Sequence, residues 1–597
     1  MPRRRLLYLL AVVAMLGQMA FAMVTTAMQQ SPTIDEPVYV ATAEVYRQQH
    51  SLRYNPEHPP LGKLIMAAGT AFAGAELDPA YPGNQTRLGR HLLYESGNNP
   101  FQLMFLARLP IILLTLLFGL VVLAFARDLA GAAGGLIALA LYAFSPDVIA
   151  HGSLATLDVP AAGMLLTAAW LTWRARKRPL LYLPLAGLAL GAALATRMSV
   201  LPAVPLLVLL AAWSMWHAQR ARPAQPAASV SEGEPQSGTE SPSGTESASG
   251  TESPSETESP RPVGALPALL RSGAAAIGVG LIAVAVVWIS YLAVDPWLRW
   301  TTPPGLPEVD GLRGLAVDLM PFPQAYRDGM LVQFKFEAKL YNGFLLGEAY
   351  RGSPWYYLPV ALLIKTPLGM LALWAAGVIT MLVLPRLRAA AVYLLPISVV
   401  LLLMAMTGSR NFGTRYVIFL PLFLAVAAGT VALIRFRYSR IVYSRIVYSQ
   451  IVYSRIAAGA LVLTVAAGSM LTFPYYLPYS NIAFGGTSKT YTNLHDANVD
   501  WGQDLARLGQ VLKTRYPGER IWLVYKGAGV PGYYGIKAEN PYAVRDDEVR
   551  GLLVVSDSRA VLAGPRLRRL LDTSVRIDQV GYSISIYRRE PLPVTRQ

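Results

Sequence analysis

Long apolar runs alternate with short polar segments along most of this chain. The first run, Leu6–Met28, is long enough at about 1.5 Å per residue to cross the roughly 30 Å hydrocarbon layer of a bilayer. Ten further runs, each about 15–30 residues long, have the length of membrane helices. The eleven predicted spans lie near 6–28, 101–126, 133–150, 157–173, 180–196, 199–217, 265–291, 355–384, 389–407, 414–434 and 457–477. The pattern therefore predicts a polytopic α-helical membrane protein with about 11 transmembrane helices.

Composition supports this fold class. Of the 597 residues, 53% are hydrophobic and only 15% charged, which a soluble chain of this length could accommodate only with a very large core. Arg3–Arg5 precede the first span as in a signal peptide, but that span exceeds the usual apolar region and lacks a clear small-residue cleavage site. We expect it to be retained as an anchor. The chain has no cysteine, which excludes disulfides and thiolate metal sites.

The basic residues between the spans predict an orientation. Short cytoplasmic loops carry an excess of Lys and Arg, and here the basic clusters fall on alternate sides of successive spans. These clusters are Arg3–Arg5, Arg127, Arg174–Arg178, Arg220 and Arg222, Arg386 and Arg388, and Arg435–Arg455. The N-terminus is therefore predicted inside and the C-terminus outside. Most of the net charge of +16 is explained by this topology, and some of the basic residues are expected to bind anionic lipid headgroups. No nucleic-acid partner is therefore expected.

Four regions are predicted along the chain. They are an N-terminal membrane module with a catalytic first loop (1–217), a disordered cytoplasmic linker (218–262), a second membrane module (263–477) and an extracytoplasmic α/β domain (478–597). The linker repeats Ser-Gly-Thr-Glu-Ser-Pro from Ser237 and has too little apolar surface to fold. A second repeat with a period of five, Tyr438–Ile456, forms no single helical face, and we interpret it as an interfacial loop.

The last region has the composition of a small soluble domain. Strands are predicted at Ile521–Tyr525, Gly551–Val555 and Ile584–Tyr587, and helices near 502–514 and 560–571. The segment from Asp496 imitates the start of a calcium loop, but its glycine is one position late and Arg507 stands where glutamate is required. We instead predict that Asp500 caps a helix with Gln503, and that Leu505, Leu508 and Leu512 form its buried face.

The candidate chemistry begins directly after the first span. Asp35 and Glu36 precede an amphipathic stretch, Val38–Tyr46, that we expect to lie as a helix along the membrane surface. Two acids at this position are also compatible with simple helix capping. Glu57-His58-Pro59-Pro60-Leu61-Gly62-Lys63 follows as a rigid turn before another apolar helix. Asp158, in Asp-Val-Pro, opens a later span from the same predicted face.

These motifs, in this order, resemble the polyprenyl-phosphate-sugar-dependent membrane glycosyltransferases. That superfamily, GT-C, includes the protein O-mannosyltransferases and the transferase that adds aminoarabinose to lipid A. The resemblance covers roughly residues 1–435, and further matches are Gly347-Glu348, Trp355-Tyr356-Tyr357, Lys365-Thr366-Pro367 and Arg415-Tyr416. The tail from Asn498 to Asp504 looks like that of a bacterial subgroup. The resemblance implies an enzyme of the bacterial inner membrane that glycosylates acceptors at the cell envelope.

The resemblance also implies roles for these residues. A lipid-linked donor holds its phosphate at the interface, so we expect Asp35 to act there as general base, supported by Glu36, with Asp158 positioning the acceptor or supporting the base. Single displacement would invert the anomeric centre. The other candidates are the phosphate-binding cations Lys365, Arg410 and Arg415, and the substrate-binding residues Glu57, His58, Lys63 and Glu348.

Alternatives remain open at this stage. Snorkelling to the interface explains any single cation, although Lys365 lies about ten residues inside its span, where an unpaired ammonium is unfavourable. His58 and His151 with Glu57 give only weak support for a divalent metal, and no other cofactor is expected. A transporter or lipid flippase is the main competing function, and a non-catalytic anchor for the tail is another. The sugar is open, and the acceptor is a lipid, a glycan or a protein.

Overall fold

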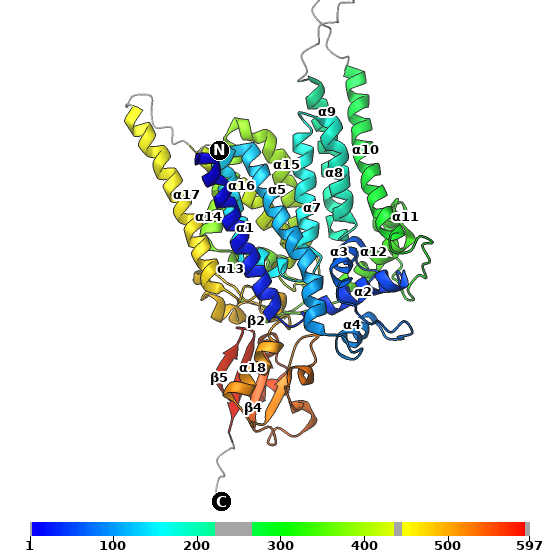
Figure 1. The fold of residues 1–597 in the computed structure, drawn as a ribbon, viewed down its shortest axis with the longest axis vertical. Coiled ribbons are helices and arrows are strands. Elements are labelled where there is room, and N and C mark those ends of the chain that lie inside the picture. The colour runs from blue at the N-terminus through cyan, green and yellow to red at the C-terminus, as the bar shows by residue number, and fades with distance from the viewer. Residues whose placement is uncertain (1–2, 221–264, 435–443, 591–597) are drawn as a thin grey trace, which may run out of the picture.

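A bundle of long helices forms the larger part of the molecule, and a small sheet domain lies at one end of it (Figure 1). The computed structural model describes residues 3–220, 265–434 and 444–590, with the backbone alone for 444–455. The bundle helices are α1 (Arg3–Gln29), α5 (Pro100–Ala143), α7 (Asp158–Arg174), α8 (Pro179–Leu194), α9 (Val204–Arg220), α10 (Ala265–Leu292), α13 (Tyr357–Lys365), α14 (Leu368–Val383), α15 (Pro385–Met406), α16 (Phe419–Gly429) and α17 (Ser444–Thr472). The predicted polytopic helical fold is confirmed.

The predicted spans fall on helices, but not on one helix each. The span 101–126 falls on α5, and the span 133–150 is divided between the end of α5 and α6 (Pro146–Gly152). The backbone of α5 breaks at Gly131, where φ is 73°. The span at 355–384 is divided between α13 and α14, which are bent by 118° because Pro367 holds Thr366 extended and cannot donate a helical hydrogen bond. Among the described residues, five helices are long and apolar enough to cross a membrane, or up to six with this bent pair. Length and composition therefore do not confirm the number eleven.

Short elements close the end of the bundle that faces the sheet domain. They are α2 (Glu36–Gln49), α3 (Leu61–Thr70), α4 (Gln85–Tyr94), α6 (Pro146–Gly152), η1 (Met198–Ala203), α11 (Gly311–Asp318), α12 (Gln324–Glu337), β1 (Asn342–Leu345), β2 (Glu348–Arg351) and η2 (Thr414–Val417). The stretch Val38–Tyr46 is helical as predicted, within α2, and its position along the membrane surface stays a prediction. Helix α2 is buried along most of its length because α3 and α4 pack against it.

The sheet domain combines one parallel and two antiparallel strand pairs. Its strands β3 (Ile521–Val524), β4 (Gly551–Ser556), β5 (Val575–Val580) and β6 (Ile584–Arg589) lie in the order β3-β4-β6-β5, with β3 and β4 parallel. The helices are α18 (Leu505–Arg515), α19 (Asp557–Ala560) and α20 (Pro565–Asp572). Single 3₁₀ turns complete the chain at η3 (Thr430–Leu433), η4 (Ile482–Phe484), η5 (Thr487–Thr492), η6 (Asp496–Asn498), η7 (Pro531–Tyr534) and η8 (Pro541–Ala543). The predicted small α/β domain is confirmed, with the half-exposed edge strand β5 in addition.

Two local predictions are wrong. Asp500 does not cap α18: the N-cap residue is Asp504, and an Asp500 oxygen instead accepts a hydrogen bond from the Gly502 amide. The predicted loop at Tyr438–Ile456 is instead helical from Ser444 onward, where α17 begins. No proline interrupts the helix in this stretch. The predicted linker lies outside the described residues, apart from 218–220, which end α9.

Candidate active site

The two acids after α1 have different surroundings. Glu36 is completely buried and holds Arg108, also buried, through two hydrogen bonds of 2.7 Å. The same carboxylate accepts from the amides of Thr33 and Ala155, at 2.8 Å each. Burial alone would raise the pKa of Glu36, but the Arg108 charge and these bonds outweigh it and lower the pKa. Both carboxylate oxygens of Glu36 are thus engaged in holding α2, α5 and the loop at Ala155 together.

Asp35 is more accessible and has a single cationic partner. Its side chain is 26% exposed, and its Oδ2 accepts a hydrogen bond of 2.6 Å from Nη1 of Arg415. The Arg415 guanidinium lies 4.4 Å from the centre of the Trp501 ring and 5.1 Å from that of Tyr416. A carboxylate held by one cation, with a lone oxygen still free to meet solvent or substrate, is suited to accept a proton.

A cavity of about 800 Å³ opens beside this pair. It lies between α7, η1, α12, α15 and η2, and the candidates Arg410, Arg415, His58 and Asp158 all line it. Its other wall is apolar and includes Leu401, Met404 and Phe419 of α15 and α16. Asp35 itself does not line the cavity and reaches it only through Arg415. The space therefore has a cationic end next to Asp35 and an apolar side.

Each cation at this end has a fixed carboxylate. Arg197, one of the cavity residues, forms an ion pair with Asp158 at the start of α7. Arg410 donates from Nε to Glu337 at 2.9 Å and from Nη2 to Gln333 at 2.5 Å. These contacts pre-orient the guanidinium groups, which lowers the conformational entropy lost when an anion binds.

Side-chain hydrogen bonds order the Glu57–Lys63 turn of the first loop. Lys63 is buried and its Nζ donates to the carbonyls of Asn55 and His58, at 3.0 and 2.7 Å. Glu57 accepts from Gln85 at 2.7 Å. Burial and the nearby Arg197 charge hold the pKa of His58 well below its usual value, so its imidazole is neutral at pH 7. Lys63 therefore orders the turn, while His58 faces the cavity.

Four predicted substrate-binding residues, Glu57, Lys63, Glu348 and Lys365, do not line this cavity. Lys365 is buried at the end of α13 with its Nζ 3.3 Å from Asp147, and it also donates to the Asn498 carbonyl. Because Lys365 lies deep in its predicted span, its ammonium is expected to have a partner. That partner is Asp147 on α6, outside the cavity. Glu348 lies exposed on β2, in a surface hairpin. Glu36 likewise does not line the cavity.

The sequence interpretation missed several polar partners. Arg108, Asp147, Arg197 and Glu337 complete the ion pairs, and Trp501 covers Arg415. Arg108, like Lys365, is a lone cation within a predicted span, so the same reasoning could have identified it from the sequence. As for metals, within the part of the chain that the structure describes, no three His, Asp or Glu side chains are grouped so as to hold an ion.

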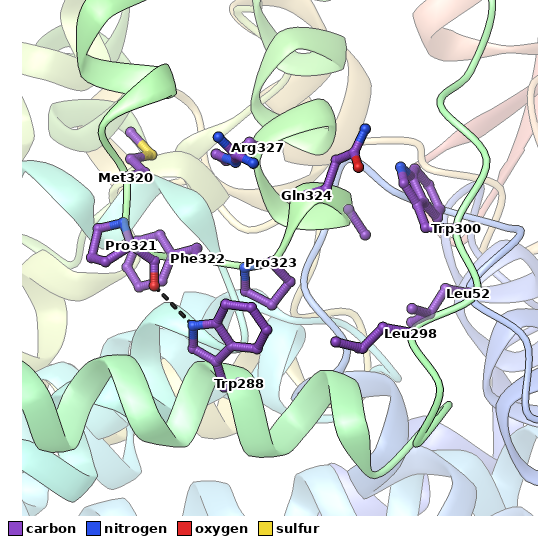
Figure 2. A pocket seen from close by; sticks show the side chains of 11 residues that line it. Leu52, Trp288, Leu298, Trp300, Met320, Pro321, Phe322, Pro323, Gln324 and Arg327 are labelled. Carbon is purple, nitrogen blue, oxygen red and sulfur yellow. Dashed lines mark hydrogen bonds between the residues drawn. The ribbon is translucent and has the colours of Figure 1, made fainter.

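A second cavity, of about 670 Å³, lies at the far end of α2 (Figure 2). Trp288, Trp300 and Phe322 line it together with Gln324 and Arg327 of α12, and the Trp288 indole donates to the Pro321 carbonyl at 2.9 Å. Leu52, also in its wall, follows α2, whereas Asp35 precedes that helix. The 14 residues of α2 separate the two positions by roughly 20 Å, so this cavity is remote from Asp35.

Comparison with known proteins bears on the N-terminal module. Residues 13–225 match the family model of dolichyl-phosphate-mannose-protein mannosyltransferases. This part of the chain is therefore similar to membrane glycosyltransferases that use a lipid-linked sugar donor. The resemblance drawn from the motifs is thereby confirmed, and nothing supports the transporter alternative.

Solved structures give a weaker likeness over the whole length. The crystal structure of ArnT from Cupriavidus metallidurans in the apo state is 13% identical, with a TM-score of 0.43, and the match covers 96% of this chain and 97% of that one. The structure of the same protein bound to undecaprenyl phosphate is 12% identical, with a TM-score of 0.44 and the same coverage. No curated protein sequence matches the chain.

Proposed function

We propose that this glycosyltransferase moves a sugar from a polyprenyl-phosphate donor to an acceptor hydroxyl at the outer face of a bacterial inner membrane. The observation that carries the proposal is the cavity with arginines at one end, an apolar side, and Asp35 bonded to one of those arginines at 2.6 Å. A lipid phosphate needs both surfaces: cations for the headgroup and apolar residues for the chain.

The apolar side supports a lipid-linked donor in particular. Met404 lines the cavity and is 52% exposed. The adjacent Leu403 is 55% exposed, so the wall formed by α15 continues onto the outer surface of the bundle. A polyprenyl chain could therefore enter sideways from the bilayer while its phosphate reaches Arg410, Arg415 and Arg197. The Nε of Arg415 is buried and has no hydrogen-bond partner among the described residues, which leaves a donor for a phosphate oxygen.

In the proposed step, Asp35 removes the proton from the acceptor hydroxyl. The acceptor oxygen forms a bond to the anomeric carbon as the bond from that carbon to the phosphate oxygen breaks, and the electron pair leaves with the phosphate. The arginines stabilise the charge that develops on the leaving group, so no acid is required. Attack from the face opposite the phosphate inverts the anomeric centre.

The outer face is proposed from the distribution of charge. The helix that begins directly after Asp35, α2, lies with α12 and the sheet domain at one end of the bundle, and the basic start of α1 lies at the other (Figure 1). The positive-inside rule places the basic end in the cytoplasm. Asp158 and His58, which line the cavity, are proposed to bind the acceptor or the sugar hydroxyls.

Asp35→Asn tests the base. Purified protein is incubated with polyprenyl-phosphate-linked sugars and a membrane extract, and transferred sugar is measured. We expect transfer to fall by about 10²–10⁴-fold, the usual contribution of a general base. The control is Glu76→Gln, which neutralises an exposed carboxylate of the same first loop. Equal transfer by the native chain and Asp35→Asn would refute the proposed base, and retention at the anomeric carbon would refute single displacement.

A further inference from the structure

The segment Asn498–Gln503 lies between the two parts of the molecule: it accepts hydrogen bonds from Tyr525 and Ser558 of the sheet domain, at 2.8 and 3.4 Å, and it also bonds to the loops of the candidate site. Its backbone contacts the loop before Asp35: the Ile34 amide donates to the Trp501 carbonyl and the Ser31 amide to the Gln503 carbonyl, each at 3.0 Å. Ser31 Oγ also donates to the Gly502 carbonyl at 2.9 Å. The residue next to Ile34 is Asp35, so these bonds fix the backbone that carries the proposed base.

The same segment holds the other side of the cavity. The Asn498 side chain accepts from the Thr414 amide at 3.0 Å and donates to the Tyr357 hydroxyl at 2.9 Å. Thr414 immediately precedes Arg415. The segment thus bonds to the residue before Asp35 and to the residue before Arg415, and it sets the distance between the two chain segments that carry the ion pair.

Trp501 acts on the ion pair directly. Its side chain is buried, with 2% exposure, and its ring centre is 4.4 Å from the Arg415 guanidinium carbon. The His151 ring contacts the indole edge to face, with centres 6.1 Å apart, which restrains the indole in turn. A guanidinium over an aromatic face is attracted by the negative potential of the ring, and the attraction is strongest where water is excluded.

We propose that Trp501 is a positioning residue for sugar transfer. The indole holds the Arg415 guanidinium in the orientation in which Nη1 bonds Asp35 and Nε remains free for the donor phosphate. Without the ring, Arg415 can rotate, so that Asp35 loses its fixed orientation and the phosphate loses a donor. This inference rests on the proposed function, and it gives Trp501 of the tail motif Asn-Val-Asp-Trp-Gly-Gln-Asp a role in positioning Arg415, in addition to the contacts that the motif makes with the sheet domain.

The test uses the full-length chain and two replacements of the same side chain. Trp501→Met fills much of the volume without an aromatic face, whereas Trp501→Phe keeps a face for Arg415. We expect Trp501→Met to lower kcat/KM for the donor by about 10- to 30-fold, the loss expected for a desolvated cation–π contact, and Trp501→Phe to recover most of it. In the Asp35→Asn background the effect of Trp501→Met should shrink, because residues that act as a unit are not additive.

The sheet domain offers a matched control. Trp522 on β3 is also buried and its ring centre lies 4.4 Å from Arg520, which directly precedes that strand, but neither residue lines the cavity. Trp522→Met should lower the melting temperature while kcat/KM of the folded fraction stays unchanged.

Three results would be decisive against the inference. If Trp501→Met lowers only the melting temperature, as Trp522→Met does, the indole is structural and the inference fails while the proposed function stands. Losses that add fully to that of Asp35→Asn would also overturn it. A native chain that transfers no sugar from any polyprenyl-phosphate donor overturns both.

Discussion

Glu36→Gln should separate the roles of the two neighbouring acids. The substitution leaves one carbonyl oxygen for the bonds that two carboxylate oxygens now make, and it turns an NH₂ group toward the N–H donors of Arg108. Arg108 is 1% exposed and would keep a buried charge without its counterion. Removing one partner of a buried pair costs about 3–5 kcal/mol, which is a large fraction of the usual 5–15 kcal/mol stability of a folded domain.

The assay is thermal unfolding of the detergent-solubilised protein, read as loss of the monodisperse species, together with sugar transfer per folded molecule. We expect a clear fall in melting temperature and near-normal transfer by the molecules that remain folded. Glu44→Gln is the control on the same helix: Glu44 is also buried and bonds Arg47, Gln48 and Thr70, but Arg47 is 33% exposed and stays solvated, so the loss of stability should be smaller, on the order of 1 kcal/mol. If Glu36→Gln melts like the native chain yet loses transfer as Asp35→Asn does, the structural role is refuted.

Two further variants address the turn and the sheet domain. Lys63→Met should loosen residues 55–58, because Nζ of Lys63 donates to the carbonyls of Asn55 and His58, and we expect faster proteolysis of this loop and a higher KM for the donor; an unchanged cleavage rate would contradict this. Burial raises the pKa of Asp500 to about 7, against a smaller lowering by Lys526. The folded state therefore holds a proton that the unfolded state has released, so stability present at pH 4 is lost as the pH rises to 7 and changes little above it. Asp500→Asn should remove this slope from melting curves measured between pH 4 and 8, and a slope that persists would refute the assignment.

The sequence predicted individual elements better than their pairing. Apolar runs located the helices, and the strands at 521, 551 and 584 were found because they are buried, apolar and β-branched. The strand at Val575–Val580 was missed because it is an edge strand with exposed and polar positions. Helix ends were less certain because Asp500 and Asp504 are equally good capping residues by type, and only the fold decides between them.

The candidate site shows the same division. Asp35, His58, Asp158, Arg410 and Arg415 were predicted from motifs on one predicted face and from the family resemblance that those motifs carry, and the structure places four of them around one cavity with Asp35 beside it. A lone cation within a span indicates that a partner exists, but nothing local says which carboxylate it is. Lys365 therefore suggested a phosphate, whereas the structure pairs it with Asp147, more than 200 positions earlier in the chain. Such pairings are set by how the helices pack, which a single sequence does not specify.

The contact between Ser31 and Gly502 also determines when the enzyme can first work during its synthesis. The two residues are 471 positions apart, so the loop that carries Asp35 leaves the ribosome long before the segment that fixes it. At about 5–20 residues per second, the delay is roughly 25 to 95 s. During this interval the growing chain is already in the membrane but lacks the segment Asn498–Gln503, which aligns Asp35 with Arg415. A chain terminated before Gly502 would therefore be inserted without this segment and would transfer no sugar, so synthesis past Gly502 would be the step that permits activity.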